Sequence, residues 1–184
     1  MVKIKTGRSS RICQGDVIKD VEYIEYVSEK EGNIEVSKIV FPLSIVLTQD
    51  CDLSQDYKFR WSQTNTNNED KWLMSVIVAP IYNVEHVYTG EHLSELDMKM
   101  TPISRKKTPG KNLQSNETPR YHYIEFPEKS SIPPSVIDFK HYYSVNVAYL
   151  KKHKTKNYAC QIGSLFRENI SHRFAFYLSR IGLP

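Results

Sequence analysis

The stretch from Phe41 to Leu53 has the period-two pattern of side chains that a β-strand produces. Its β-branched residues suit a strand, and Pro42 fits only at the strand's first residues. Asp52, followed three residues later by Gln55, is typical of a helix start. We therefore expect a strand, a tight corner and a short helical turn. The expected apolar face carries Leu43, Ile45, Leu47, Gln49 and Cys51, and the other face carries Ser44, Val46, Thr48, Asp50 and Asp52.

The segment from Trp72 to Pro80 is apolar on both faces between Leu73 and Ala79. A strand that is buried on both sides has this composition. The pattern predicts a central strand that lies beside the strand beginning at Phe41.

Further strands and one hairpin follow from the same patterns. The turn signal Lys30–Asn33 predicts a hairpin between two strand-like segments. Strands are expected at Arg120–Phe126, at Val136–Phe139 and from Tyr142 to Leu150. A short helix, weakened by Gly90, is expected within 83–96.

The segment from Ser164 to Ile181 has the spacing of an amphipathic helix. Ser164 suits the N-cap position. The expected apolar stripe contains Phe166, Ile170, Phe174, Tyr177 and Ile181, widened by Leu165 and Leu178. We expect this helix to pack on the sheet.

These elements predict one α+β domain, mostly β, over residues 1–184. Its sheet is expected to be small and strongly bent, or closed into a barrel, with the C-terminal helix packed on it. A hydrophobic fraction of 40% is enough for a core and argues against a disordered chain.

The charge and the cysteine content narrow the class of protein to which the chain can belong. The chain is mildly basic, with a net charge of +4 and a pI near 8.8, which is compatible with nucleic-acid binding. Three cysteines without framework spacing indicate a reducing, cytoplasmic setting. The N-terminus lacks the apolar region of a signal peptide, and no apolar run is long enough to cross a membrane.

Basic residues gather in a loop near the N-terminus, which contains Arg8 and Arg11, and in two further segments. The first of these is a long loop or insertion at about 98–119, and the second lies within 151–156. Either segment could contact phosphates or be merely a solvated charged loop. The candidate nucleic-acid-binding residues are Arg105, Lys106, Lys107, Lys111, Lys151, Lys152 and Lys154.

Cys51 admits three interpretations. It could be a small buried residue, since free cysteine is commonly buried and the alternation places it on the apolar face. It could be a nucleophile, although its neighbours Asp50 and Asp52 disfavour a thiolate, so that a His or Arg would have to arrive from elsewhere. It could be a metal ligand, although the chain has no C-x-x-C or H-E-x-x-H spacing.

His122 and Arg120 are the first candidates as partners of Cys51, because a strand would hold both rigidly. His122 is in phase with Ile124 and Phe126, and a histidine on an apolar face is more often a core residue than a catalyst. Asp50 and Asp52 share a strand face and could form an acid pair or a cation site. The alternative is that one of these two carboxylates caps the helical turn and the other is solvated.

The order of three motifs resembles that of the PemK/MazF-like bacterial toxins. The matching segments are Gly15–Val17, Phe41–Leu47 and Val76–Ile81, and a C-terminal helix follows them. The resemblance covers about the first half of the chain and implies a small Src-homology-3-like barrel. The corner at 49–53 and the ending at 171–184 are similar to uncharacterised bacterial proteins.

Two positions depart from this family's pattern. The resemblance places a catalytic Arg before the proline and a Thr after Pro-Ile, where this chain has Phe41 and Tyr82. Neither side chain can stabilise phosphoryl charge as Arg does. The usual ribonuclease activity of the family is therefore not expected.

Three hypotheses about function follow. The first is a bacterial cytoplasmic accessory protein of a toxin or defence locus, which binds RNA, DNA or a partner protein of the same locus. The second is a hydrolase or transferase with Cys51 as nucleophile, His122 as base, and Asp50 or Arg120 as an orienting group. The third is a metal-supported fold. No cofactor or metal site is assigned, and a homodimer is left open.

Overall fold

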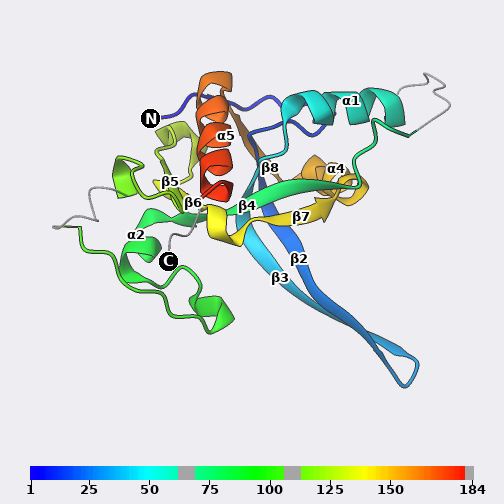
Figure 1. Cartoon of the computed structure of the whole chain (residues 1–184), viewed down its shortest axis with the longest axis horizontal. Helices are drawn as coiled ribbons and strands as arrows, with labels where there is room; N and C mark the ends of the chain where they lie inside the picture. The colour runs from blue at the N-terminus through cyan, green and yellow to red at the C-terminus, as the bar shows by residue number, and fades with distance from the viewer. Residues whose placement is uncertain (62–68, 106–112, 181–184) are drawn as a thin grey trace.

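The computed structural model describes residues 1–61, 69–105 and 113–180. Its described strands form an 8-stranded sheet that is strongly curled into a half-barrel (Figure 1). The strand order is β1-β8-β2-β3-β4-β6-β5, with β7 also paired to β4, and the strand pairs are antiparallel. The expected α+β class, mostly β with a C-terminal helix, is confirmed.

The strands have these bounds: β1 Ile4–Lys5, β2 Asp16–Lys30, β3 Asn33–Val46, β4 Ser75–Asn83, β5 Tyr121–Ile124, β6 Ser135–Asp138, β7 Tyr143–Asn146 and β8 Tyr158–Ile162. The helices have these bounds: α1 Asp50–Trp61, α2 Val84–Thr89, α4 Val147–Asn157 and α5 Ser164–Leu178, with 3-10 turns η1 Ser94–Leu96, η2 Glu128–Ser130 and η3 Phe139–His141.

The expected central strand pair is present. Ile45 of β3 lies opposite Ala79 of β4, and Val46 lies opposite Val78. β4 also pairs with β6 and β7, and its two faces lie in different hydrophobic cores, since Val78 belongs to one core and Ala79 to the other. This burial explains why its sequence has apolar residues on both faces.

Successive side chains of the central strands enter two different cores. Val17 of β2 and Ile45 of β3 lie in the core that contains Ile170 of α5. Their neighbours Ile18 and Val46 lie in the core on the opposite face. This division follows from the pleat, which sends adjacent residues to opposite faces.

Helix α5 covers one of these cores. Ile170 and Phe174 are buried, and Phe166 and Tyr177 pack against the same core, so the predicted stripe is confirmed. The prediction that Leu165 and Leu178 widen this stripe was wrong, because their side chains are 75% and 52% exposed. Ile181 lies outside the described residues.

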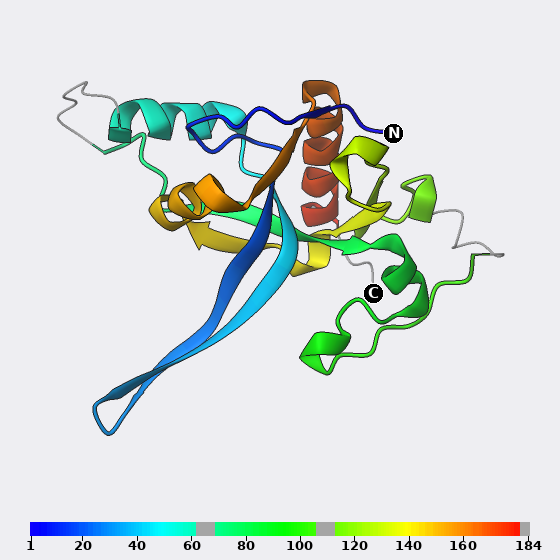
Figure 2. The ribbon, with the colours of Figure 1, turned by 180° about the vertical axis from the view of Figure 1, so that it is seen from behind.

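The β2–β3 hairpin is much longer than its sheet neighbours and projects from the body (Figures 1 and 2). Its two-residue turn consists of Glu31 and Gly32, at φ 52° and 79°. Positive φ at both positions is the hairpin turn whose twist matches that of the strands, and glycine adopts it without strain. The hairpin predicted at Lys30–Asn33 is confirmed.

Two strand predictions extended too far. The strand from Phe41 ends at Val46, and α1 begins at Asp50, so Cys51 is exposed on a helix rather than buried on a strand. The strand from Tyr142 ends at Asn146, whose Oδ1 accepts a hydrogen bond from the Tyr149 amide at 3.1 Å and caps α4. In both places a residue whose side chain favours a helix start, Asp50 or Asn146, ended the strand although the residues that follow were expected to continue it.

Gly90 ends α2 in the left-handed conformation, at φ 79°. Its amide donates to the carbonyls of His86 and Val87, as a helix-terminating glycine does. Within the described part of the chain, the helices are too short and too polar to traverse a lipid bilayer.

Candidate nucleic-acid interface

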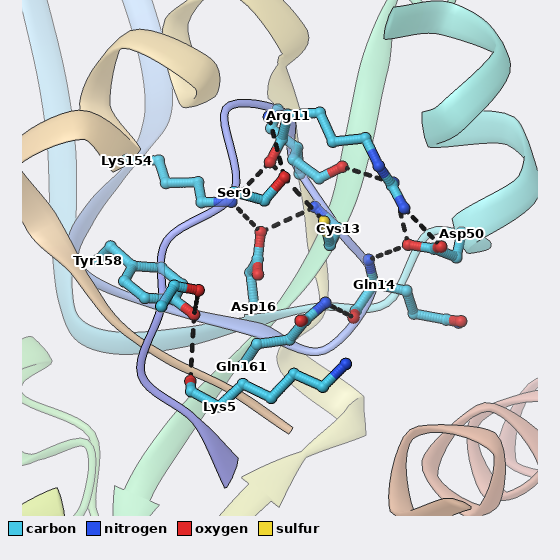
Figure 3. A network of polar contacts seen from close by, with 12 residues as sticks. Lys5, Ser9, Arg11, Cys13, Gln14, Asp16, Asp50, Lys154, Tyr158 and Gln161 are labelled. Atoms are coloured by element: carbon cyan, nitrogen blue, oxygen red, sulfur yellow. Dashed lines mark hydrogen bonds and ion pairs between the residues drawn. The ribbon is translucent and has the colours of Figure 1, made fainter. Parts of the chain in front are cut away.

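The loop before β2 is fixed to α4 by a buried ion pair (Figure 3). Lys154 Nζ lies 2.6 Å from Asp16 Oδ2 and also donates to the Arg11 carbonyl at 2.6 Å. The side chains of Asp16 and Lys154 are 2% and 3% exposed. Burial raises the pKa of Asp16, while Lys154 and the Cys13 amide, which donates to Asp16 Oδ2 at 2.7 Å, oppose the rise.

The same loop is tied to the first residue of α1. Arg11 donates to both carboxylate oxygens of Asp50, at 3.1 and 2.8 Å, and the Gln14 amide donates to Asp50 Oδ1 at 3.1 Å. Burial opposes ionisation of Asp50, but these donors hold its pKa below the ordinary value. Asp50 therefore anchors the loop, and a carboxylate is also favoured at a helix N-terminus.

These anchors bring the segment 8–10 against α1 and α4. Arg8 donates a hydrogen bond to the Thr155 carbonyl, and Tyr57 of α1 donates to Ser10 Oγ at 3.2 Å. Arg8 is exposed. A cation is thus held beside the two helices by contacts that come from residues far apart in the sequence.

Cationic side chains lie over aromatic rings on this side of the molecule. Lys151 Nζ is 4.3 Å from the ring centroid of Trp61 and 5.6 Å from that of Tyr57. The Arg60 guanidinium is 4.5 Å from the Trp72 ring and 5.3 Å from the Trp61 ring. These distances are those of cation–π interactions.

A hollow of about 360 Å³ lies beside Arg8, Trp61, Lys151 and Lys152. Trp61 and Trp72 are 37% and 41% exposed, so their rings remain accessible to a ligand. We name this region the α1–α4 surface and define it by Arg8, Tyr57, Arg60, Trp61, Trp72, Lys151 and Lys152.

The α1–α4 surface combines two features that suit a single nucleic-acid strand. Lys and Arg neutralise phosphates without reading sequence. Exposed aromatic rings can stack on bases, which contributes about 1–3 kcal/mol per base. Both features occur here within one hollow.

The residues predicted to bind nucleic acid lie in different places. Lys151 and Lys152 belong to the α1–α4 surface. Lys154 is buried and its ammonium group is committed to Asp16, so it cannot face a phosphate as expected. Arg105 lies elsewhere, paired with Glu85 and 4.7 Å from the Tyr88 ring. Lys106, Lys107 and Lys111 lie outside the described residues.

Cys51 and its expected partners do not form one cluster. α1 and β5 lie on opposite sides of α5 in Figures 1 and 2. The hydrogen bond given for the Cys51 thiol is to Asp52 Oδ1, at 3.5 Å. The carboxylate of Asp50 faces Arg11 instead. Among the residues that the structure describes, the thiol of Cys51 therefore has no base beside it of the kind that the enzyme hypothesis requires.

His122 is a core residue on β5. It is 6% exposed, its ring lies 6.2 Å from the Phe139 ring, and its Nδ1 has no hydrogen-bond partner. Burial, together with the charge of Arg173, lowers the pKa of His122 to about 3. The imidazole is therefore neutral at physiological pH and buried away from Cys51.

Arg120 is committed to Asp138. Its Nε and Nη2 donate to the two carboxylate oxygens at 2.9 and 2.6 Å, and His141 Nδ1 lies 2.8 Å from Asp138 Oδ2. Burial alone would raise the pKa of Asp138, but these partners outweigh it and hold the pKa at about 2. The cluster locks β6 and η3 together, because the Lys140 amide also donates to Asp138 at 3.0 Å.

The sequence patterns did not single out Tyr57, Arg60, Trp61 or Trp72. Residues 57–61 alternate aromatic and cationic side chains, and Trp72 follows eleven residues later; this interleaving was the available signal. Within the described ranges, no group of three or more His, Cys, Asp or Glu residues could hold a metal ion, so the metal hypothesis has no ligand set there.

No protein-family model matches the chain, and the comparison with curated proteins gives no match.

Proposed function

We propose that this protein binds single-stranded nucleic acid through the α1–α4 surface. The observation that carries the proposal is the stacking of Lys151 on the exposed ring of Trp61, at a hollow that Arg8 and Lys152 also line. Phosphates would contact these three cations, and bases would stack on the exposed rings. Base stacking makes the expected binding tolerant of sequence.

The distribution of charge supports this proposal. The projecting hairpin at residues 20–40 contains six acidic residues and two lysines, which give it a charge of −4. Since the whole chain carries +4, the remaining residues carry +8. The body is therefore much more basic than the overall pI indicates, and a basic body attracts a polyanion.

The proposed biological setting is a bacterial toxin or defence locus, as the order of the motifs implies. The likeness to PemK/MazF-like toxins supports a role at a bacterial toxin or defence locus. Phe41 and Tyr82 stand where that family has its catalytic Arg and Thr, which argues for binding rather than for the family's usual cleavage.

Fluorescence anisotropy with labelled single-stranded RNA and DNA of mixed sequence tests the proposal. Trp61→Ala should weaken binding by about 10- to 100-fold through the loss of base stacking. Lys151→Gln should weaken binding. It should also reduce the slope of the logarithm of the binding constant against the logarithm of the salt concentration by about the amount that one phosphate contact contributes.

Two matched variants control for general effects. Phe176→Ala removes an aromatic ring that is 60% exposed on α5, and Lys129→Gln removes an exposed lysine on η2. Both should bind as the wild type does. Absence of binding at low salt, or an equal loss in the control variants, would overturn the proposal.

A further inference from the structure

The hairpin at residues 20–40, which we name the arm, exposes an unusual number of large apolar side chains. They are Tyr23, Ile24, Tyr26, Val27, Ile34, Val36 and Val40, between 37% and 73% exposed. Scattered exposed apolar residues need no explanation, but a contiguous group marks an interaction site.

Most of these side chains share one face of the arm. Val27 lies opposite Val36, and Ile24, Ile34 and Val40 lie on the same face at neighbouring positions of the ladder. The polar members of this face include Glu22 and Lys38, which form an ion pair at 2.5 Å. The result is an apolar stripe with acidic flanks along a two-stranded ribbon.

A ribbon of this kind is poorly stable alone. An isolated two-stranded hairpin is marginal in water, and a third strand or a packing surface is needed for independent stability. Within the described ranges, the strands of the arm beyond its base pair only with each other, because β3 joins β4 through residues 44–46 and β2 joins β8 through residues 16–18. An apolar partner surface would supply the missing layer.

The charge of the arm selects the kind of partner. A charge of −4 repels nucleic acid and anionic membranes, and it attracts a basic surface. The other residues of this chain carry +8. Their α1–α4 surface also presents apolar contact area, since the rings of Trp61 and Trp72 are 37% and 41% exposed.

The arm does not use the α1–α4 surface of its own chain. Figures 1 and 2 show the arm leaving the sheet on the side away from α1. At about 3.3 Å per residue, ten residues of a strand extend about 33 Å, roughly twice the radius of gyration of about 16 Å for a domain of this length. An arm of this length can reach a neighbouring molecule.

We propose that the arm of one copy docks on the α1–α4 surface of a second copy, in a reciprocal, twofold-symmetric dimer. The stripe formed by Val27, Ile34 and Val36 packs against Trp61 and Trp72 of the other copy. The acidic flanks of the arm lie beside Lys151 and Lys152. The dimer does not depend on nucleic-acid binding, because the arm and the second copy supply both sides of the contact.

Sedimentation velocity of the full chain at low salt, over a range of concentrations, tests this proposal. The wild type should form a dimer that salt weakens. Ile34→Asp combined with Val36→Asp should raise the dimer dissociation constant at least about 100-fold, because two β-branched side chains lose their burial. Leu165→Asp, at a residue 75% exposed on α5, should not affect the dimer.

A charge exchange identifies the two surfaces. Glu22→Lys with Glu29→Lys, both on the face of the arm that carries the stripe, reverses the charge of that face, and Lys151→Glu with Lys152→Glu reverses the α1–α4 surface. Each double variant alone should be mostly monomeric, and an equimolar mixture should recover a heterodimer, in which one contact is that of the wild type and the other has both charges reversed. Circular dichroism checks that each variant is folded.

Three results would overturn the proposal. They are a monomeric wild type at all concentrations, a dimer that is insensitive to the arm variants, and a mixture that forms no heterodimer. Nucleic-acid binding by a monomeric wild type would leave the proposed function intact and remove only this inference.

Discussion

Replacement of His122 provides a direct test of the electrostatics of the core. In the folded protein its pKa is lowered to about 3, first by burial and then by the charge of Arg173. In the unfolded chain a histidine has a pKa of about 6.5. Between these values the unfolded chain binds more protons than the folded protein, so stability falls as the pH drops from about 6.5 towards 3.

The magnitude follows from the two pKa values. Integration of the proton linkage for a single group with pKa values of about 6.5 and 3 gives a loss of about 2 kcal/mol between pH 7 and pH 5. The side chain is 6% exposed, so solvent screening reduces this figure little. The variant His122→Leu removes the titrating group and keeps an apolar side chain in the core.

Urea unfolding at pH 7 and pH 5 measures the effect. The wild type should lose about 2 kcal/mol more than His122→Leu between the two pH values, and comparison of the two losses cancels the packing change that the substitution causes. His172→Leu, at an exposed position of α5, should respond to pH as the wild type does. Equal losses in the wild type and in His122→Leu would refute the reasoning.

Three further predictions concern single residues. Asp138→Ala leaves the Arg120 guanidinium without its partner and should lower the free energy of unfolding by about 3–5 kcal/mol in urea titrations. Gly90→Ala should lower the melting temperature, because the added Cβ would meet the Met100 carbonyl oxygen at 2.2 Å and the φ of 79° is strained for alanine. In the native protein a thiol reagent should modify Cys51 rapidly and the other two cysteines only after unfolding, since Cys51 is the exposed one; mass spectrometry locates the label.

The parts of the fold that the sequence predicted are those in which burial repeats with a regular period. β4 is apolar on both faces because each face lies in a different hydrophobic core, and the stripe of α5 follows from the single face that it buries. The hairpin was readable because Gly32 marks a turn that requires positive φ. In each case local pattern and tertiary burial agree.

Helix α1 could not be read in this way. Its buried residues are Leu53 and Asp56, so it presents no apolar stripe. Asp56 is held by Arg60 Nη2 at 2.7 Å and by the Leu73 amide at 2.8 Å. A helix whose buried side chains make polar contacts leaves no apolar period in its own sequence, so the only sign of Trp61 was the alternation of aromatic and cationic residues at 57–61.

The site predictions failed where a charge has a distant partner. Lys154 stands in a run of lysines and is indistinguishable from its neighbours by sequence. Its partner Asp16 lies 138 residues earlier in the chain, and only the pairing of β2 with β8 brings them together. Lys151 and Lys152 occupy the same helix but lie at the surface. The distinction between a buried and a surface lysine is therefore a tertiary property.

The two proposals together make nucleic acid and the arm competitors for one surface. If both bind the α1–α4 surface, their binding is mutually exclusive, and each must weaken the other by the same factor. At a concentration of 100 times its dissociation constant, single-stranded nucleic acid stabilises the state in which the arm has left the α1–α4 surface by about 2.7 kcal/mol. Each arm contact is then weakened about 100-fold.

Sedimentation with labelled oligonucleotide should therefore show the dimer converting to nucleic-acid-bound monomer. The Ile34→Asp, Val36→Asp variant, with its α1–α4 surface already open, should bind the oligonucleotide more tightly than the wild type does. A ternary species containing a dimer with both surfaces occupied by nucleic acid would show that the arm and the nucleic acid use different surfaces.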